Sequence, residues 1–150
     1  LSFLKSNHKN LLGTKNCNQL CASEVEINAG IRQGDSLSPL LFNLVLDKII
    51  ENIKGTGNGY KMAEKQIKIL CYADDAILIS DNEDNLQRMA QTFNTVAKNY
   101  NMKISTANTK SLVVSREPIR CKLVINNELI EQVSKFQYLG IEICSYGDVK

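Results

Sequence analysis

Apolar residues recur every three or four positions in the stretch that follows Pro39. The repeating positions, with polar residues between them, are Phe42, Val45, Leu46, Ile49 and Ile53. This spacing puts the apolar side chains on one face, so it predicts an amphipathic helix. Ser38 is a suitable N-cap, Pro39 suits the first helical position, and Gly55 is expected to end the helix.

A second helical pattern covers residues 82–100. Its apolar stripe consists of Leu86, Met89, Ala90, Phe93, Val96, Ala97 and Tyr100. Ser80 and Glu83 have the spacing of a capping box, in which each side chain bonds the backbone amide of the other residue. We therefore expect both helices to turn an apolar face toward a core.

Shorter stretches alternate between apolar and polar residues, which is typical of half-buried strands. Two such strands flank the turn at 72–75, and Asn126 with Asn127 suits a type I′ hairpin turn between strands at 121–125 and 128–133. The other predicted strands lie at 24–27, 112–114 and 136–143. Together these elements predict an α+β domain, with an antiparallel sheet and two main helices packed on one of its faces.

The composition is that of one folded domain. The chain has 150 residues, of which 43% are hydrophobic and 23% are charged, and no apolar run approaches the roughly 20 residues that cross a bilayer. The net charge of +2 neither requires nor excludes a nucleic-acid partner. The odd number of cysteines, five, indicates reduced thiols and no disulfide-linked partner. We therefore expect an intracellular protein, of the nucleus or the cytoplasm, with no membrane partner.

The adjacent carboxylates Asp74 and Asp75 are the first candidates for chemistry. They lie in a turn between two apolar strands, which would hold them at a defined place on a core sheet. Two neighbouring carboxylates repel each other unless a cation neutralises them, and hard divalent cations such as Mg²⁺ take oxygen ligands. The alternative is an ordinary polar hairpin tip, because Asp is common in turns.

A glycine-containing segment at 30–39 precedes the first helix. Gly30 and Gly34 permit close approach of the backbone to a ligand, while Arg32 and Gln33 supply hydrogen-bond donors. The helix N-terminus that follows is suited to phosphate. The alternative is a plain loop that leads into a capped helix.

Three lysines, Lys61, Lys65 and Lys68, precede the carboxylate turn. They are candidates for contact with a nucleic-acid backbone. A solvated polar face accounts for them equally well.

Four segments, in this order, resemble blocks of the reverse transcriptases of non-LTR (LINE-type) retrotransposons. The segment 30–43 (GIRQGDSLSPLLFN) resembles their Gln-Gly-Asp…Ser-Pro block, and 72–75 (YADD) resembles their active-site hairpin. The segment 104–112 resembles the part that follows the next helix, and 138–140 (YLG) resembles the hairpin called the primer grip. The resemblance covers about residues 22–146.

This resemblance implies the palm of a right-hand polymerase, which copies an RNA template by adding deoxynucleoside triphosphates to the 3′ end of a DNA primer. Such a nucleotidyltransferase uses two metal ions, expected to be Mg²⁺, at the attacking and leaving oxygens. By resemblance, Asp74 and Asp75 are the catalytic and metal-binding carboxylates. The other implied roles are nucleotide and template binding by Arg32, Gln33, Gly34 and Lys110, and the primer grip by Tyr138, Leu139 and Gly140.

The implied domain organisation is a partial reverse transcriptase domain over residues 1–150. It comprises a remnant of the fingers or connecting region at 1–29, the palm at 30–134, and the primer-grip hairpin with a truncated end at 135–150. These boundaries are expectations from the resemblance alone.

The chain departs from the family pattern at its N-terminal side. The family has a third catalytic carboxylate on a strand well before the Gln-Gly-Asp block, but the acids in 1–30 are Glu24 and Glu26, close to that block. We therefore expect a sheet that lacks its first strand and exposes an unpaired edge. A Lys that is usual in the family is replaced by Asn108, and Lys110, two positions on, keeps the same face of a strand.

The leading functional hypothesis is an RNA-directed DNA polymerase (reverse transcriptase) fragment of a non-LTR retrotransposon. The alternative is a catalytically inactive remnant or a nucleic-acid-binding module, since the third carboxylate is absent from this chain. The fragment alone is predicted to be inactive. Another palm-type enzyme, such as a cyclase, is disfavoured by the blocks at 33–35 and 138–140.

Overall fold

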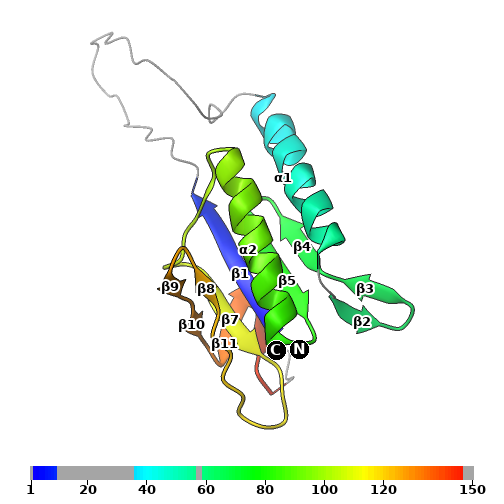
Figure 1. Ribbon diagram of the computed structural model, residues 1–150, viewed down its shortest axis with the longest axis vertical. Helices are drawn as coiled ribbons and strands as arrows, with labels where there is room; N and C mark the ends of the chain where they lie inside the picture. The colour runs from blue at the N-terminus through cyan, green and yellow to red at the C-terminus, as the bar shows by residue number, and fades with distance from the viewer. Residues whose placement is uncertain (1, 10–35, 57–58, 147–150) are drawn as a thin grey trace.

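The computed structural model describes residues 2–9, 36–56 and 59–146, and Figure 1 shows its elements. The helices are α1 (Ser38–Gly55) and α2 (Glu83–Asn99). The strands are β1 (Ser2–Lys9), β2 (Tyr60–Met62), β3 (Lys65–Ile67), β4 (Ile69–Tyr72), β5 (Asp75–Ser80), β6 (Lys103–Ile104), β7 (Lys110–Val113), β8 (Val124–Ile125), β9 (Glu128–Leu129), β10 (Glu131–Gln132), β11 (Lys135–Tyr138) and β12 (Ile141–Cys144). The predicted mixture of two helices and short strands is confirmed. The strand predicted at 24–27 lies outside the described residues.

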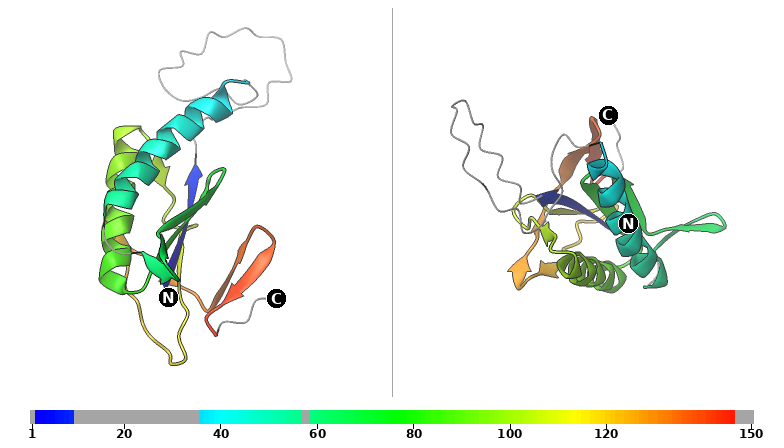
Figure 2. Two further views of the ribbon diagram at one scale, coloured as in Figure 1. Left: turned by 90° about the vertical axis from the view of Figure 1, so that its right-hand side faces the viewer. Right: turned by 90° about the horizontal axis from the view of Figure 1, so that it is seen from above.

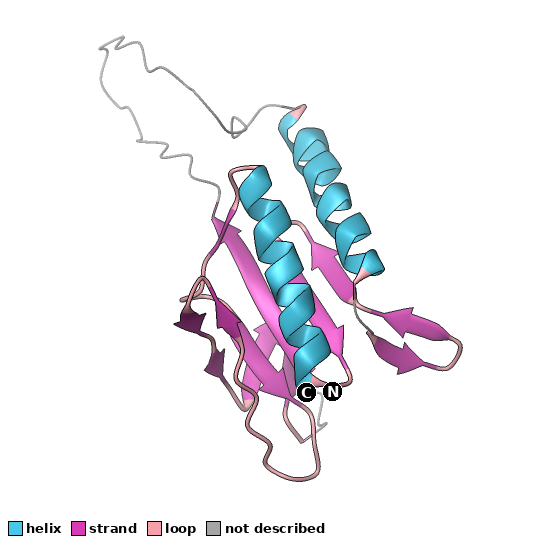
Figure 3. Cartoon of the chain, viewed as in Figure 1, coloured by secondary structure: helices cyan, strands magenta, loops and turns pink. Residues whose placement is uncertain are grey.

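The largest sheet has the strand order β10-β7-β1-β5-β4, and β6 pairs with the end of β1 (Figures 1 and 3). Its pairings are antiparallel except that of β10 with β7. In β1, Phe3 lies opposite both Ile79 of β5 and Leu112 of β7. Our expectation that the sheet lacks its first strand, and exposes an unpaired edge in its place, is therefore wrong, because β1 pairs with both β5 and β7. Backbone hydrogen bonds build β1 into the sheet, and they do not need the apolar alternation that residues 2–9 lack.

Both faces of this sheet are covered. Figure 2 shows α1 and α2 side by side on one face and the β11–β12 hairpin on the opposite face. Side chains alternate along β5, so Leu78 packs with the helices, whereas Ile77 and Ile79 pack with Phe136 of the hairpin. The prediction that two helices lie on one face is confirmed, and the hairpin adds a third layer that the sequence analysis did not predict.

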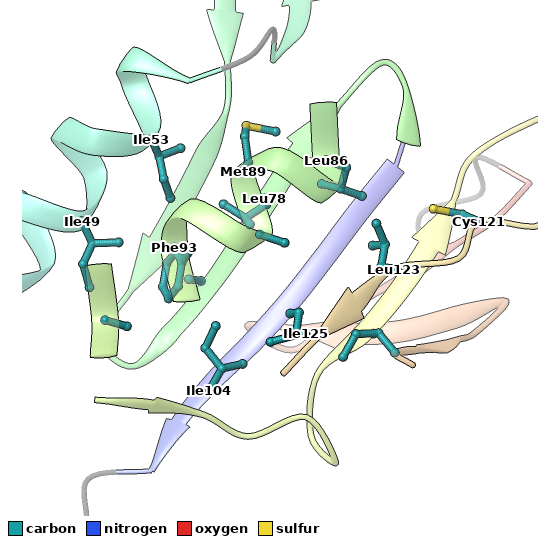
Figure 4. Packing of buried hydrophobic residues seen from close by; sticks show 14 of the residues in the cluster. Ile49, Ile53, Leu78, Leu86, Met89, Phe93, Ile104, Cys121, Leu123 and Ile125 are labelled. Atoms are coloured by element: carbon teal, nitrogen blue, oxygen red, sulfur yellow. The ribbon is translucent and has the colours of Figure 1, made fainter. Parts of the chain in front are cut away.

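The larger core lies between the two helices and the sheet (Figure 4). The buried side chains that the helices contribute to it are Ile49, Ile53, Leu86, Met89, Ala90, Phe93 and Ala97. At the margins of the predicted stripes, Phe42, Val45 and Val96 are half-buried and Tyr100 is exposed. The helical spacing therefore predicted the fully buried residues correctly, and it predicted more burial than the structure shows for the other four.

Helix α1 begins and ends close to the predicted positions. Leu37 occupies the N-cap, so Ser38, the predicted cap, is the first helical residue. Gly55 is the last helical residue, as predicted. Leu40 and Leu44 are exposed, which means that α1 is anchored to the core mainly through its C-terminal half.

Helix α2 is capped one residue before its start. The Asn82 side-chain oxygen accepts a hydrogen bond from the backbone amide of Asn85 at 2.8 Å. The predicted Ser80–Glu83 capping box is wrong. The Glu83 carboxylate instead accepts a hydrogen bond from the backbone amide of Lys122 at 2.8 Å, which ties the helix start to a distant loop.

The turn at Asn126 and Asn127 has the predicted geometry. Both residues have positive φ, 53° and 63°, and they lie between the paired residues Ile125 and Glu128. Asn tolerates this conformation at little cost, so the type I′ turn is confirmed. The strands beside it are shorter than predicted, because β10 leaves this hairpin and pairs with β7.

A further hairpin, β2–β3, precedes the carboxylate turn and was not predicted. A Cβ built on Gly59 would lie 2.4 Å from the carbonyl oxygen of Ile67 and 2.5 Å from Cγ of Lys68. The Lys68 ammonium donates hydrogen bonds to the carbonyl oxygens of Lys54 and Thr56 at 2.6 and 3.0 Å. Lys68 therefore satisfies carbonyls at the C-terminal end of α1, and the base of the hairpin is fixed to that helix end.

Gly59→Ala is expected to destabilise the fold, because the added methyl group meets backbone atoms that cannot move away. We expect the free energy of unfolding to fall by about 1–3 kcal/mol, the usual cost of overpacking. Urea unfolding followed by circular dichroism measures this change. The matched control is Gly55→Ala, where a Cβ meets nothing within 4 Å and stability should hold or rise slightly. Equal effects of the two substitutions on the free energy of unfolding would contradict the close approach of Gly59 to the backbone of Ile67.

Candidate active site

Asp74 and Asp75 lie at the end of the β4–β5 hairpin. Tyr72 pairs with Asp75, which leaves Ala73 and Asp74 as the two loop residues. Ala73 adopts a left-handed φ of 50°, so the chain reverses within two residues. Asp74 is exposed, and Asp75, the first residue of β5, is half-buried. The hairpin therefore holds one carboxylate at its tip and the next at the end of a core strand.

Asp75 belongs to the face of the sheet that the β11–β12 hairpin covers. It is two residues from Ile77, and residues two apart in a strand share a face. Ile77 packs with Phe136 of the hairpin. Burial raises the pKa of the Tyr138 phenol, and Cys71 and Asp75, when charged, raise it further. The structure therefore brings Asp75 close to Tyr138, a predicted primer-grip residue.

The other two predicted primer-grip residues form the tip of this hairpin. Leu139 and Gly140, with φ of 50° and 84°, connect the paired residues Tyr138 and Ile141. The Leu139 side chain is exposed although its backbone is in the left-handed region, which is costly for a residue with a Cβ. The tip thus presents an apolar side chain at a sharply defined position.

The donor set at the carboxylate turn suits a hard divalent cation. Asp74 and Asp75 supply carboxylate oxygens, the ligands that Mg²⁺ takes in proteins. Burial raises the pKa of the neighbouring Cys71 thiol to about 11, so without a bound metal this thiol is protonated at neutral pH. Among the residues that the structure describes, no three His, Cys, Asp or Glu side chains group into a metal site. The described residues therefore fit a metal ion by donor type but are too few for a closed site.

Strand β1 lies directly beside the carboxylate turn. Its sequence is SFLKSNHK, and its register places Asn7 opposite Asp75. This strand contains neither Asp nor Glu, so it cannot supply a third carboxylate.

Lys110 is engaged in an ion pair. Its ammonium nitrogen lies 2.5 Å from Oε2 of Glu131, across the parallel pairing of β7 with β10. In the sheet, Lys110 lies opposite Lys5 of β1. Lys5 in turn lies opposite Ile77, which is two residues from Asp75 along β5. The nucleotide-binding role of Lys110 stays a prediction. Sequence reasoning missed Glu131, because only the β7–β10 pairing brings the two side chains together.

Arg32, Gln33 and Gly34 lie outside the described residues. Their predicted place beside the carboxylate turn therefore stays a prediction. In the described part of the chain, neither α1 nor α2 is long and apolar enough to cross a membrane.

Comparison with known families places this geometry in context. A family described as "Reverse transcriptase (RNA-dependent DNA polymerase)" matches residues 3–143. The chain therefore belongs to the reverse transcriptase family, whose members generally use divalent metal ions and act on a nucleic-acid template and primer.

The relatives of this chain indicate which kind of reverse transcriptase the domain resembles. The chain is 29% identical over 132 residues to a "Retrovirus-related Pol polyprotein from type-1 retrotransposable element R2" of Nasonia vitripennis, and 34% identical over 127 residues to a protein of the same description from Popillia japonica. These alignments cover 81% and 76% of this chain but only 13% and 17% of the relatives. Its domain is thus that of a non-LTR element, and the chain spans less than a fifth of the length of these relatives.

Asp75→Asn is expected to lower the pKa of Tyr138. A nearby carboxylate disfavours the phenolate, so removing its charge favours ionisation, while burial keeps the pKa above its usual value of 10. Titration of ¹³C-labelled tyrosine by NMR, with Tyr138→Phe to assign the signal, measures the shift.

The matched control for this titration is Asp81→Asn, which removes an exposed carboxylate just beyond the other end of β5. It should leave the Tyr138 pKa unchanged. An equal fall of the pKa in both variants, or no fall in either, would contradict the proximity of the carboxylate turn to the β11–β12 hairpin.

Proposed function

We propose that this chain is the palm segment of an RNA-directed DNA polymerase from a non-LTR retrotransposon. In that polymerase it places the carboxylate turn at the end of a sheet, beside a primer-holding hairpin that covers the face to which Asp75 belongs. The observation that carries the proposal is that the β11–β12 hairpin, which contains Tyr138, packs through Phe136 against Ile77 on the sheet face to which Asp75 belongs. The family membership supports the reaction class, and the shared face supports the assignment of these residues to one site.

The proposed reaction is nucleotidyl transfer. The 3′ hydroxyl of the primer gives up its proton to water, and its oxygen forms a bond to the α-phosphorus of a deoxynucleoside triphosphate. The bond from the α-phosphorus to the oxygen that bridges it to the β-phosphorus breaks, and pyrophosphate leaves with those electrons. Divalent metal ions, which we propose to be Mg²⁺, stabilise the negative charge on these oxygens when bound. Asp74 and Asp75 would hold them. Tyr138, Leu139 and Gly140 would hold the primer end beside the turn.

The remaining residues are proposed to act on the incoming nucleotide and template. Arg32, Gln33 and Gly34 would contact them from the segment before α1. Lys110 would contact the nucleotide after breaking its ion pair with Glu131. An ion pair near the protein surface contributes only about 0–1 kcal/mol, so breaking this pair to bind the nucleotide costs little free energy.

The domain boundaries belong to the same proposal. Residues 30–134 would derive from the palm and 135–150 from the primer-grip hairpin. Of residues 1–29, expected to come from the fingers or connecting region, residues 2–9 form β1 in the centre of the sheet, so this strand would belong to the palm. The RNA template, the DNA primer and the deoxynucleoside triphosphates are the proposed partners.

A second candidate is a segment that folds or binds nucleic acid but does not catalyse. Strand β1, which lies beside the carboxylate turn, contains no Asp or Glu. The two-metal reaction would then need a carboxylate from another part of a complete polymerase.

The isolated 150-residue chain is accordingly expected to incorporate no nucleotide on a primed RNA template. Gel analysis of a labelled primer with Mg²⁺ present measures this, and a commercial reverse transcriptase serves as the positive control. Magnesium-dependent extension by the isolated chain would show that its own carboxylates suffice.

In a complete polymerase that contains this segment, Asp74→Asn is expected to slow primer extension by at least about a hundred-fold, the usual effect of losing a group that stabilises transition-state charge. The matched control is Asp47→Asn, an exposed carboxylate on α1, which should leave the rate unchanged. Undiminished extension by the Asp74 variant would remove this residue from the chemistry.

A further inference from the structure

The β2–β3 hairpin extends sideways from the body of the protein. Figures 1 and 2 show it beyond the β4 edge of the sheet, with neither helix covering it. Residues 60–66 are all exposed, including the apolar Met62 and the aromatic Tyr60. A two-stranded ribbon with so little burial adds almost nothing to the core and is marginally stable by itself.

The base of this hairpin is nevertheless held firmly. The backbone of Gly59 packs against that of Ile67, and the Lys68 ammonium bonds two carbonyl oxygens at the end of α1. An exposed ribbon on a fixed base is suited to contact something outside the chain.

The pairing register sorts the side chains of the hairpin onto two faces. Paired residues of an antiparallel ribbon share a face. Tyr60 pairs with Ile67, and Met62 pairs with Lys65, so these four lie on one face. Lys61 and Gln66 form the pair between them and lie on the other face.

The first of these faces continues the site described above. Ile67 packs with the cluster of Ile77 and Phe136, on the side of the sheet that carries Asp75 and Tyr138. Lys65, two residues before Ile67, therefore points to the same side. Residues 59–68 hold three lysines against one glutamate, a net +2. Lys65 is the lysine of this face, since Lys61 lies on the other face and Lys68 bonds the carbonyls at the end of α1, and its charge fits an anionic partner.

We propose that the Lys65 face of the β2–β3 hairpin binds the phosphate backbone of a nucleic-acid duplex that extends from the carboxylate turn. The choice of nucleic acid as partner rests on the proposed function. Lys65 is nine residues from Asp74, with β4 between them, a span of at most about 30 Å at roughly 3.3 Å per residue. At about 3.4 Å per base pair, that is roughly nine base pairs, so one duplex reaches both places.

The test measures binding of the full 150-residue chain to a fluorescein-labelled RNA–DNA heteroduplex of about 20 base pairs, by fluorescence anisotropy between about 50 and 200 mM salt. Each phosphate contact adds about 0.9 to the slope of log K against log salt concentration. We expect Lys65→Ala to reduce this slope by about 0.9, and Lys65→Arg to restore it.

Lys61→Ala is the matched control, because it removes the same charge from the same hairpin but from the other face. It should leave the slope unchanged. Equal losses in the two variants, an unchanged slope in Lys65→Ala, or no binding by the unsubstituted chain would each overturn the proposal. Primer extension by the Asp74 variant of a complete polymerase tests the proposed function separately, so a failure of one is not a failure of the other.

Discussion

Strand β5 is buried on both of its faces, and the position of the carboxylate turn follows from this double burial. Ala76 and Leu78 pack under the helices, whereas Ile77 and Ile79 pack under the β11–β12 hairpin. If β5 shifted by one residue along its neighbours, the side chains that now face the helices would face the hairpin, and the reverse, although the two cores differ in shape. Packing therefore sets the register of the β4–β5 hairpin, and with it the place of Asp75 at the end of the strand.

The parts of the fold that depend on local pattern were predictable, and those that depend on pairing were not. Buried residues such as Phe93 repeat at helical spacing, so both helices were found. Along β5 both alternating sets are apolar, which signals burial but does not reveal which element covers the second face. Residues 2–9 have weak alternation, so their central place in the sheet follows only from backbone pairing with β5 and β7. The β2–β3 hairpin escaped prediction because its residues are nearly all exposed.

The candidate site also combines features that local sequence pattern predicts with features that only strand pairing creates. The turn that holds Asp74 and Asp75 is a local feature, because apolar strands flank it directly. The proximity of Asp75 to Tyr138 joins segments that lie far apart in the sequence, and the family resemblance, not the spacing, suggested it. The ion pair between Lys110 and Glu131 has no sequence signal, since it forms only where β10 lies parallel to β7. The part of the site expected at Arg32 and Gln33 lies outside the described residues.

The proposed site requires the β11–β12 hairpin to pack on the face of the sheet that carries Asp75. A double-mutant cycle with Ile77→Val and Phe136→Leu, followed by urea unfolding, measures this packing. We expect an interaction energy of at least about 0.5 kcal/mol between these two sites, whereas Leu78→Val and Phe136→Leu, on opposite faces, should be additive. Additive effects of the Ile77 and Phe136 substitutions would instead place the hairpin away from this face and contradict the proposed site.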